Sequence, residues 1–285
     1  MLRTLRKAVV VLCVPLLLAP AHAASLADAI DAVVRSKAAA RARIGVCVAE
    51  LGSGRERYAH DADRPLRLAS NTKLLTVWAA LELLGAEHPL RTTLYRRGTL
   101  AGQVLLGDLV LEGRGDPTLG QRFDGAPEVA FRRMARAVRQ AGIVEVRGDL
   151  VLDARYFAPP LQHPDWPRDQ LDRWYEAPVS ALTLQDGCVD VTVGPGAAAG
   201  APAVVRLVPA GTPLRVENRC TTVGKDGRHV VAVGRKPATD VIVVRGSVRL
   251  GSRPRTVSIA LRDPAIVVGH VLRRALEAEG VSVGG

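Results

Sequence analysis

Short runs of alternating apolar and polar residues, separated by glycine and proline, recur between residues 103 and 261 of this 285-residue chain. Such alternation predicts strands with one buried face, because successive side chains of a strand point to opposite sides of a sheet. The region is therefore expected to be rich in β-structure. The expected strands are residues 103–111, 149–153, 189–193, 204–208, 230–233, 241–250 and 257–261.

Helical spacing of apolar residues predicts four helices, three of which carry recognisable end signals. These signals are a capping box, a glycine stop and an Asp-Pro start. A two-strand hairpin is expected between the first two helices. The expected elements are a helix from Ser25, a hairpin of residues 44–48 and 57–60, a buried helix from Ser70 to Gly85, an amphipathic helix around residues 131–138, and a helix from Asp263 to Gly280.

The first 23 residues are expected to be a cleavable secretory signal peptide. Basic residues precede an apolar run from Ala8 to Ala19, and Ala21-His22-Ala23 provides a small-residue cleavage site, so the mature chain would begin at Ala24. The alternative is a membrane anchor, but about twelve apolar residues are too few to cross a bilayer. We expect a protein located in the periplasm or elsewhere outside the cytoplasm, with no stable membrane span after cleavage.

The formal net charge of +11 would fall to +8 with the loss of Arg3, Arg6 and Lys7. This charge favours anionic surroundings such as cell-wall polymer or a membrane surface, although it also fits a simple compositional bias. Arginine is spread along the chain and forms no single basic run. Nucleic acid is therefore not an expected partner.

The sequence leaves open whether the cysteines form a disulfide. Loss of Cys13 with the signal peptide would leave Cys47, Cys188 and Cys220 in an oxidising compartment that permits a disulfide. Cys188–Cys220 is the pair expected if a bridge forms, and three unbridged thiols are the alternative. Cysteine and histidine show no metal-ligand spacing, so no metal is expected.

Ser70 and Lys73 form the candidate catalytic pair. A spacing of three residues at a helix start places both side chains on one face, within reach of each other. A lysine with a lowered pKa can take the proton of a serine hydroxyl that attacks a carbonyl, and amide groups at the helix start can stabilise the oxyanion. The alternative is a serine cap followed by a solvated lysine.

The stretch from Pro65 to Thr76, which holds this pair, resembles the active-site segment of the low-molecular-mass class C penicillin-binding proteins. That family consists of D-Ala-D-Ala carboxypeptidases and endopeptidases. Further segments are similar to family landmarks and follow in family order: residues 107–119, 148–153, 177–184 and 263–265. Residues 113–119 and 177–184 are the most specific, and we expect them to be structural turns and strands.

The resemblance implies an α+β, DD-peptidase/β-lactamase-like serine acyl-transferase domain interrupted by a large, mostly β insertion. The implied division is a signal peptide (1–23), the first part of the catalytic domain (24–88), an insertion of α+β and β character in two subdomains (89–262), and the start of the returning, incomplete catalytic domain (263–285).

Two further catalytic motifs of the resembled family, Ser-x-Asn and Lys-Thr-Gly, are not found in this sequence after Lys73. After Lys73, no Ser or Tyr is followed two places later by Asn, and the closest match to Lys-Thr-Gly is Lys225-Asp226-Gly227, in an expected turn with Lys225 solvated. The resemblance therefore implies a C-terminally truncated chain. We expect little or no peptidase turnover from residues 24–285.

The implied function is that of a serine-type D-Ala-D-Ala carboxypeptidase or endopeptidase that acts on peptidoglycan stem peptides through a Ser70 acyl-enzyme. β-Lactams would act as covalent inhibitors, and no metal or organic cofactor is implied. A β-lactamase or esterase is a rival that the long insertion disfavours. A second rival is a non-catalytic periplasmic protein that keeps the scaffold and binds peptidoglycan.

Overall fold

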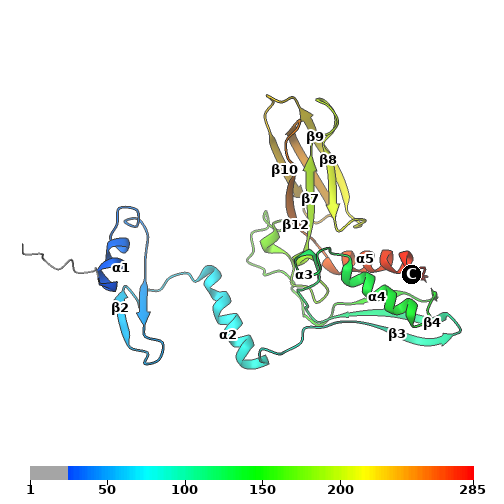
Figure 1. Ribbon diagram of the computed structural model, residues 1–285, viewed down its shortest axis with the longest axis horizontal. Coiled ribbons are helices and arrows are strands. Elements are labelled where there is room, and N and C mark those ends of the chain that lie inside the picture. Colours follow the sequence, from blue (N-terminus) through cyan, green and yellow to red (C-terminus); the bar gives the residue numbers. More distant parts are fainter. Residues whose placement is uncertain (1–24) are drawn as a thin grey trace, which may run out of the picture. The chain divides into compact units, whose positions relative to one another are not determined.

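A computed structural model describes residues 25–285, so the expected signal peptide lies outside the described residues. The chain divides after Glu87 into two units, called here unit 1 (described from residue 25 to 87) and unit 2 (88–285). Among residues 25–285, no helix combines the length and the apolar character that a membrane crossing requires. Figure 1 shows the elements of both units.

Unit 1 begins with the predicted helix and hairpin. The Ser25 side chain accepts a hydrogen bond from the Asp28 amide, and the Asp28 carboxylate accepts one from the Ser25 amide, so the capping box is confirmed. The hairpin strands pair antiparallel, and the Tyr58 hydroxyl donates to Asp31, which ties the hairpin to the helix. These elements are α1 (Leu26–Val34), β1 (Val46–Ala49) and β2 (Glu56–His60).

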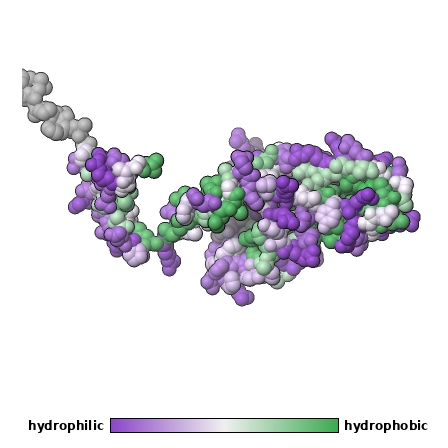
Figure 2. All heavy atoms as spheres, turned by 90° about the horizontal axis from the view of Figure 1, so that it is seen from below, coloured by the Kyte–Doolittle hydropathy of each residue, from purple (hydrophilic) through white to green (hydrophobic). Residues whose placement is uncertain are grey.

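The predicted second helix of unit 1 is present, but the expectation that it is buried is wrong. A 3-10 turn, η1 (Ala69–Asn71), leads into α2 (Thr72–Leu84), which ends at Gly85 in the left-handed region (φ 82°). None of its side chains is buried, and Trp78 is 63% exposed. Figure 2 shows hydrophobic residues on the visible surface of this helix. Periodicity marks an apolar helix surface, and no described part of unit 1 buries it.

Unit 2 contains a five-stranded sheet in the order β13-β5-β4-β3, with β6 also pairing with β4. Helix α4 provides the predicted amphipathic stripe, and α5 starts at Asp263 as expected, with the Asp263 carboxylate accepting from the Ala265 amide. The elements are β3 (Thr92–Ala101), β4 (Val104–Gly113), α3 (Gln121–Asp124), α4 (Val129–Gln140), β5 (Glu145–Val146), β6 (Leu150–Asp153), α5 (Pro264–Ala278) and β13 (Ser282–Val283).

The remaining strands of unit 2 form two three-stranded sheets, in the orders β10-β11-β9 and β12-β7-β8. Five of these strands match predicted ones. β9 does not, because its sequence Arg-Val-Glu-Asn-Arg-Cys-Thr-Thr-Val offers few apolar residues to alternate. The strands are β7 (Cys188–Gly194), β8 (Val204–Val208), β9 (Arg215–Val223), β10 (Val230–Arg235), β11 (Val241–Arg249) and β12 (Arg255–Ala260), preceded by the 3-10 turns η2 (Trp174–Glu176) and η3 (Gln185–Gly187).

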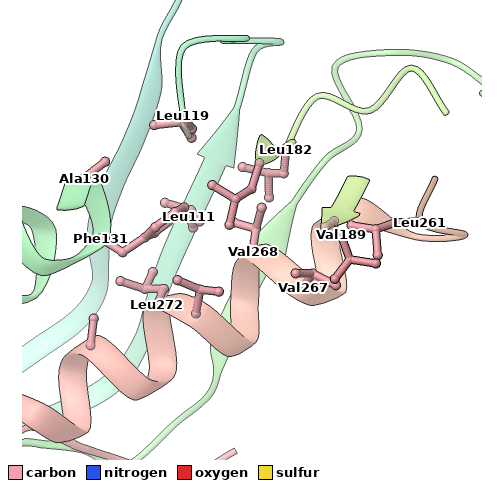
Figure 3. Close-up of a cluster of buried hydrophobic side chains, with 14 of the residues drawn as sticks. Leu111, Leu119, Ala130, Phe131, Leu182, Val189, Leu261, Val267, Val268 and Leu272 are labelled. Atoms are coloured by element: carbon pink, nitrogen blue, oxygen red, sulfur yellow. The ribbon is translucent and has the colours of Figure 1, made fainter. Parts of the chain in front are cut away.

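One hydrophobic cluster joins the helical and β-rich parts of unit 2. Figure 3 shows Phe131 of α4 beside Leu111 of β4, with Val268 and Leu272 of α5 and Leu182 in the same cluster. Phe131, Leu111 and Leu272 are fully buried. Burial of a side chain of this size stabilises the folded chain by about 1.5–3 kcal/mol.

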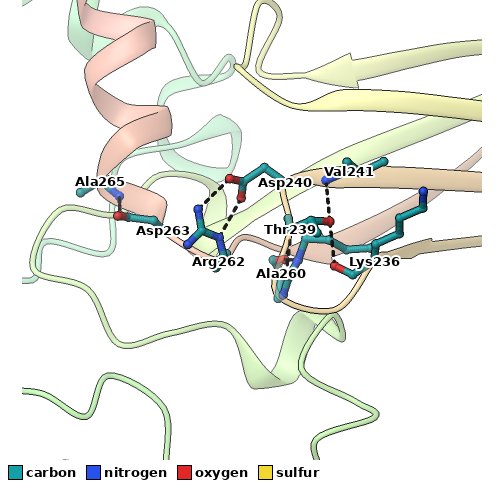
Figure 4. A network of polar contacts seen from close by, with 9 residues as sticks. Lys236, Thr239, Asp240, Val241, Ala260, Arg262, Asp263 and Ala265 are labelled. Carbon is teal, nitrogen blue, oxygen red and sulfur yellow. Dashed lines mark hydrogen bonds and ion pairs between the residues drawn. The ribbon is translucent and has the colours of Figure 1, made fainter.

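A polar network holds the junction between β12 and α5. Arg262 forms an ion pair with Asp240 at 2.8 Å, as Figure 4 shows. The half-buried Arg235 guanidinium donates to the carbonyl oxygens of Leu171, Thr239 and Ala260. These bonds join the loop before β11 to the end of β12.

Residues 264–285 are integrated into unit 2. α5 packs against α4 and β6, and β13 pairs in parallel with β5. The structure shows no division at the 262/263 boundary that the sequence suggests. The assignment of these residues to a returning catalytic domain stays a prediction.

The Cys188–Cys220 bridge, one of the two alternatives that the sequence left open, is absent from the structure, where Cys47, Cys188 and Cys220 are free thiols. Cys188 is the first residue of β7. The Cys220 carbonyl oxygen accepts a hydrogen bond from the amide of Ala203, the residue directly before β8, and the start of β8 pairs with the far end of β7. Seven residues of strand span about 20 Å, well beyond the reach of a disulfide.

Candidate active site

Ser70 lies in the short turn that leads into α2. The preceding residue, Ala69, has φ 46°, a left-handed conformation that costs energy for a residue with a Cβ. The amide of Asn71 donates to the carbonyl oxygen of Leu68 and closes the turn. A strained residue in the turn that precedes a helix is a feature that sequence periodicity does not reveal.

The structure brings Ser70 and Lys73 together. The Lys73 ammonium nitrogen donates to the Ser70 hydroxyl oxygen at 3.3 Å, and both residues are exposed. The proximity follows from helical geometry, since residues three apart in the first turn lie on one face. This arrangement can pass a proton between hydroxyl and amine.

The two most specific sequence segments lie side by side in unit 2. The Gly115 amide donates to the Ala181 carbonyl oxygen at 3.0 Å, and the Gln185 amide donates to the Leu119 carbonyl oxygen at 3.0 Å. Ser180 is buried and its hydroxyl donates to the Leu182 carbonyl oxygen. These contacts are those of packed turns and extended segments.

Lys225 lies in the turn between β9 and β10 and is exposed, as expected for a solvated lysine. The Gly227 amide closes this turn by donating to the Gly224 carbonyl oxygen. Among the described residues, no three side chains of the His, Cys, Asp and Glu types are placed to hold a metal ion.

A cavity of about 570 Å³ in unit 2 was not predicted from the sequence, because its walls come from distant segments. Its lining includes Trp174, Cys188, Asp190 and Ser258. Burial raises the pKa of the Cys188 thiol to about 12. The thiol is therefore protonated near neutral pH. Because only the thiolate is a good nucleophile, Cys188 does not compete with Ser70 as a candidate nucleophile.

Comparison with protein families matches residues 26–285 to the D-Ala-D-Ala carboxypeptidase 3 (S13) family. A D-alanyl-D-alanine carboxypeptidase of Actinomadura sp. (strain R39) is 35% identical over 271 residues, which are 93% of this chain and 49% of that protein. A second relative, the carboxypeptidase DacB of Haemophilus influenzae, is 24% identical over 231 residues, or 76% of this chain and 44% of that protein.

Among solved structures, penicillin-binding protein 4 of H. influenzae matches 84% of this chain and 52% of that chain, with a TM-score of 0.67 and 20% identity. A structure of the same protein in complex with a β-lactam matches with a TM-score of 0.61, 19% identity and coverage of 84% and 49%. The α+β, DD-peptidase/β-lactamase-like fold class is thus confirmed for part of that fold. The chain spans about half the length of the curated relatives it matches.

Proposed function

The chain belongs to the D-Ala-D-Ala carboxypeptidase 3 (S13) family, a family of serine D-Ala-D-Ala carboxypeptidases, and on this premise we propose that Ser70 is its nucleophile. The observation that carries the proposal is the 3.3 Å separation between the Lys73 ammonium nitrogen and the Ser70 hydroxyl oxygen. The proposed substrate is the D-Ala-D-Ala end of a peptidoglycan stem peptide. The proposed site of action lies outside the cytoplasm.

In the proposed reaction, the Ser70 oxygen attacks the carbonyl carbon of the penultimate D-Ala. The Lys73 amine takes the hydroxyl proton and passes it to the leaving D-Ala nitrogen, so the peptide bond breaks as the ester forms. Water then releases the acyl group and restores the Ser70 hydroxyl. The oxyanion would be stabilised by amide groups at the helix start.

After Lys73 the sequence contains no Ser-x-Asn and no Lys-Thr-Gly motif. In the family these residues support proton transfer and hold the substrate carboxylate. We therefore expect the first step, acylation of Ser70, to be slow and the overall turnover to be lower still, since partners in a catalytic unit contribute non-additively.

D-Ala release from a dipeptide-terminated substrate such as diacetyl-Lys-D-Ala-D-Ala tests the proposal. The wild-type chain should release D-Ala at a low rate, and Ser70→Ala should release none. Lys73→Met should reduce the rate by about 100-fold or more, because a positioned general base typically contributes at least that factor.

Lys37→Met is the matched control, since Lys37 is another exposed lysine of unit 1, and it should leave the rate unchanged. Equal release by the wild-type chain and by Ser70→Ala would contradict the proposal. The rival role, a non-catalytic protein that binds peptidoglycan, predicts binding of the substrate with no D-Ala release from any variant.

A further inference from the structure

The β-rich part of unit 2 accounts for most of the chain's formal net charge. Eleven Lys and Arg residues and four Asp and Glu residues give residues 188–260 a formal net charge of +7, out of +11 for the whole chain. The proposed peptidase chemistry at Ser70 uses none of these residues. Their position, rather than the overall composition, therefore needs an explanation.

Much of this charge lies on one face of the sheet β10-β11-β9. Along β9, odd-numbered residues point outward, because the even-numbered Cys220 and Thr222 are buried. Along β11, Arg245 and Arg249 point outward, because Val244 and Val248 are fully buried. We call the outward set the arginine face, and its charged members are Arg215, Glu217, Arg219, Lys236, Arg245 and Arg249.

Two arginines of this face are direct neighbours. Arg219 of β9 and Arg245 of β11 are register partners in a parallel pair, which places their Cα atoms about 5 Å apart. Like charges in such a position destabilise a sheet. An anion bound between the two guanidinium groups would remove the repulsion.

The single carboxylate of the arginine face does not neutralise the positive charge of that face. Glu217 forms ion pairs with Lys236 and with Arg219, at 3.0 Å for the latter, and the Lys236 ammonium holds the pKa of this carboxyl below its ordinary value. Arg215 and Arg245 take part in no side-chain hydrogen bond or ion pair with any described residue. Five cations and one carboxylate leave a local charge of +4.

A hollow of about 290 Å³ opens on the arginine face. Lys236 and Arg245 line it together with the small residues Ala232 and Gly234 and the side chain of Val243. A hollow between cationic groups can seat a compact anionic group such as a phosphate. Guanidinium groups bind phosphate oxygens in pairs, which favours arginine over lysine on such a surface.

We propose that the arginine face docks the chain onto a linear phosphodiester polymer of the cell envelope. A membrane surface is the poorer fit, because membrane binding gains strength from apolar side chains that insert beside the cations, and Val230, 45% exposed, is the one large apolar residue exposed on this face among the described residues. The proposal goes beyond the reaction at Ser70 and does not depend on it.

Binding of a fluorescently labelled oligo(glycerol phosphate) to the purified chain, followed by anisotropy, tests this proposal. The double variant Arg219→Gln/Arg245→Gln should weaken binding at least about tenfold at about 50 mM salt, because two charge-assisted phosphate contacts are lost. Arg132→Gln/Arg139→Gln on α4 removes the same charge from two exposed arginines elsewhere in unit 2 and should weaken binding less than about twofold.

Wild-type binding should also fall on the order of 50-fold between about 50 and 200 mM salt, as expected for about four phosphate contacts. This readout does not depend on the folding of any variant. Ser70→Ala should bind the polymer as the wild type does, which separates this proposal from the proposed catalysis. Equal losses in the two double variants, absence of salt dependence, or binding to phosphatidylglycerol vesicles without binding to the polymer would overturn the proposal.

Discussion

The Gly115 amide donates a hydrogen bond to the Ala181 carbonyl oxygen at 3.0 Å and so joins the end of β4 to the segment before β7. The contact needs a close backbone approach. Gly113, two residues earlier, lies so near the same carbonyl that a Cβ at this position would overlap the Ala181 oxygen. The two segments that resemble family landmarks are thus held together by backbone groups.

Gly113→Ala should destabilise unit 2 by about 1–3 kcal/mol, because the added methyl group must displace the backbone of Ala181. Gly224→Ala is the control, since a Cβ there meets nothing within 4 Å. The midpoint of chemical denaturation measures both. A midpoint for Gly113→Ala equal to that of the control would show that the segments separate without cost.

Asp263→Ala should lower the stability of unit 2 by about 1 kcal/mol, because the carboxylate caps α5 by accepting from the Ala265 amide at 3.1 Å. Asp263→Asn keeps a side-chain oxygen at the cap and should retain most of that stability. Thermal unfolding of the two variants makes the comparison. If both lose the same stability, the Asp263 charge, and not the cap, is the source of the effect.

The rate of alkylation should distinguish the exposed cysteine from the two buried ones. At pH 8, iodoacetamide should modify the exposed Cys47 and spare Cys188 and Cys220, which are buried. Mass spectrometry of the digested chain identifies the modified sites. Modification of Cys188 as fast as that of Cys47 would show that the walls of its cavity open readily.

The raised pKa of Cys188 also gives a direction for the dependence of stability on pH. Its folded pKa of about 12 lies above the ordinary value of 9.0, so the unfolded chain loses this proton first as the pH rises. The associated stability is complete below pH 9 and is lost between pH 9 and about 12. Cys188→Ala should lose less stability than the wild type over this range, as measured by denaturation at each pH.

The elements with strong local signals were predictable from the sequence. The capping box at Ser25, the glycine after α2 and the Asp-Pro start of α5 each mark an end by a side chain or backbone preference that needs no distant partner. β3 and β9 were not predicted, because their outward faces carry arginine and threonine and their pairing depends on distant strands.

Features that depend on which residues are neighbours in space could not be predicted from the sequence. The apolar character of α2 indicated burial, yet its exposure is set by what packs against it, and the Cys188–Cys220 spacing gave no measure of the distance between the ends of β7. The spacing of Ser70 and Lys73 was sufficient to predict their contact, because helix geometry is local. The arginine face became visible only with the register of β9 and β11.

The most direct test of Ser70 as nucleophile is the intact mass of the purified chain after incubation with benzylpenicillin, with Ser70→Ala measured in parallel. The Ser70 oxygen that would attack the peptide carbonyl would also attack the β-lactam carbonyl. The resulting adduct can be detected without turnover. We predict a covalent penicilloyl adduct on the wild-type chain and none on Ser70→Ala. A folded chain that gains no adduct, or an adduct that persists in Ser70→Ala, would contradict it.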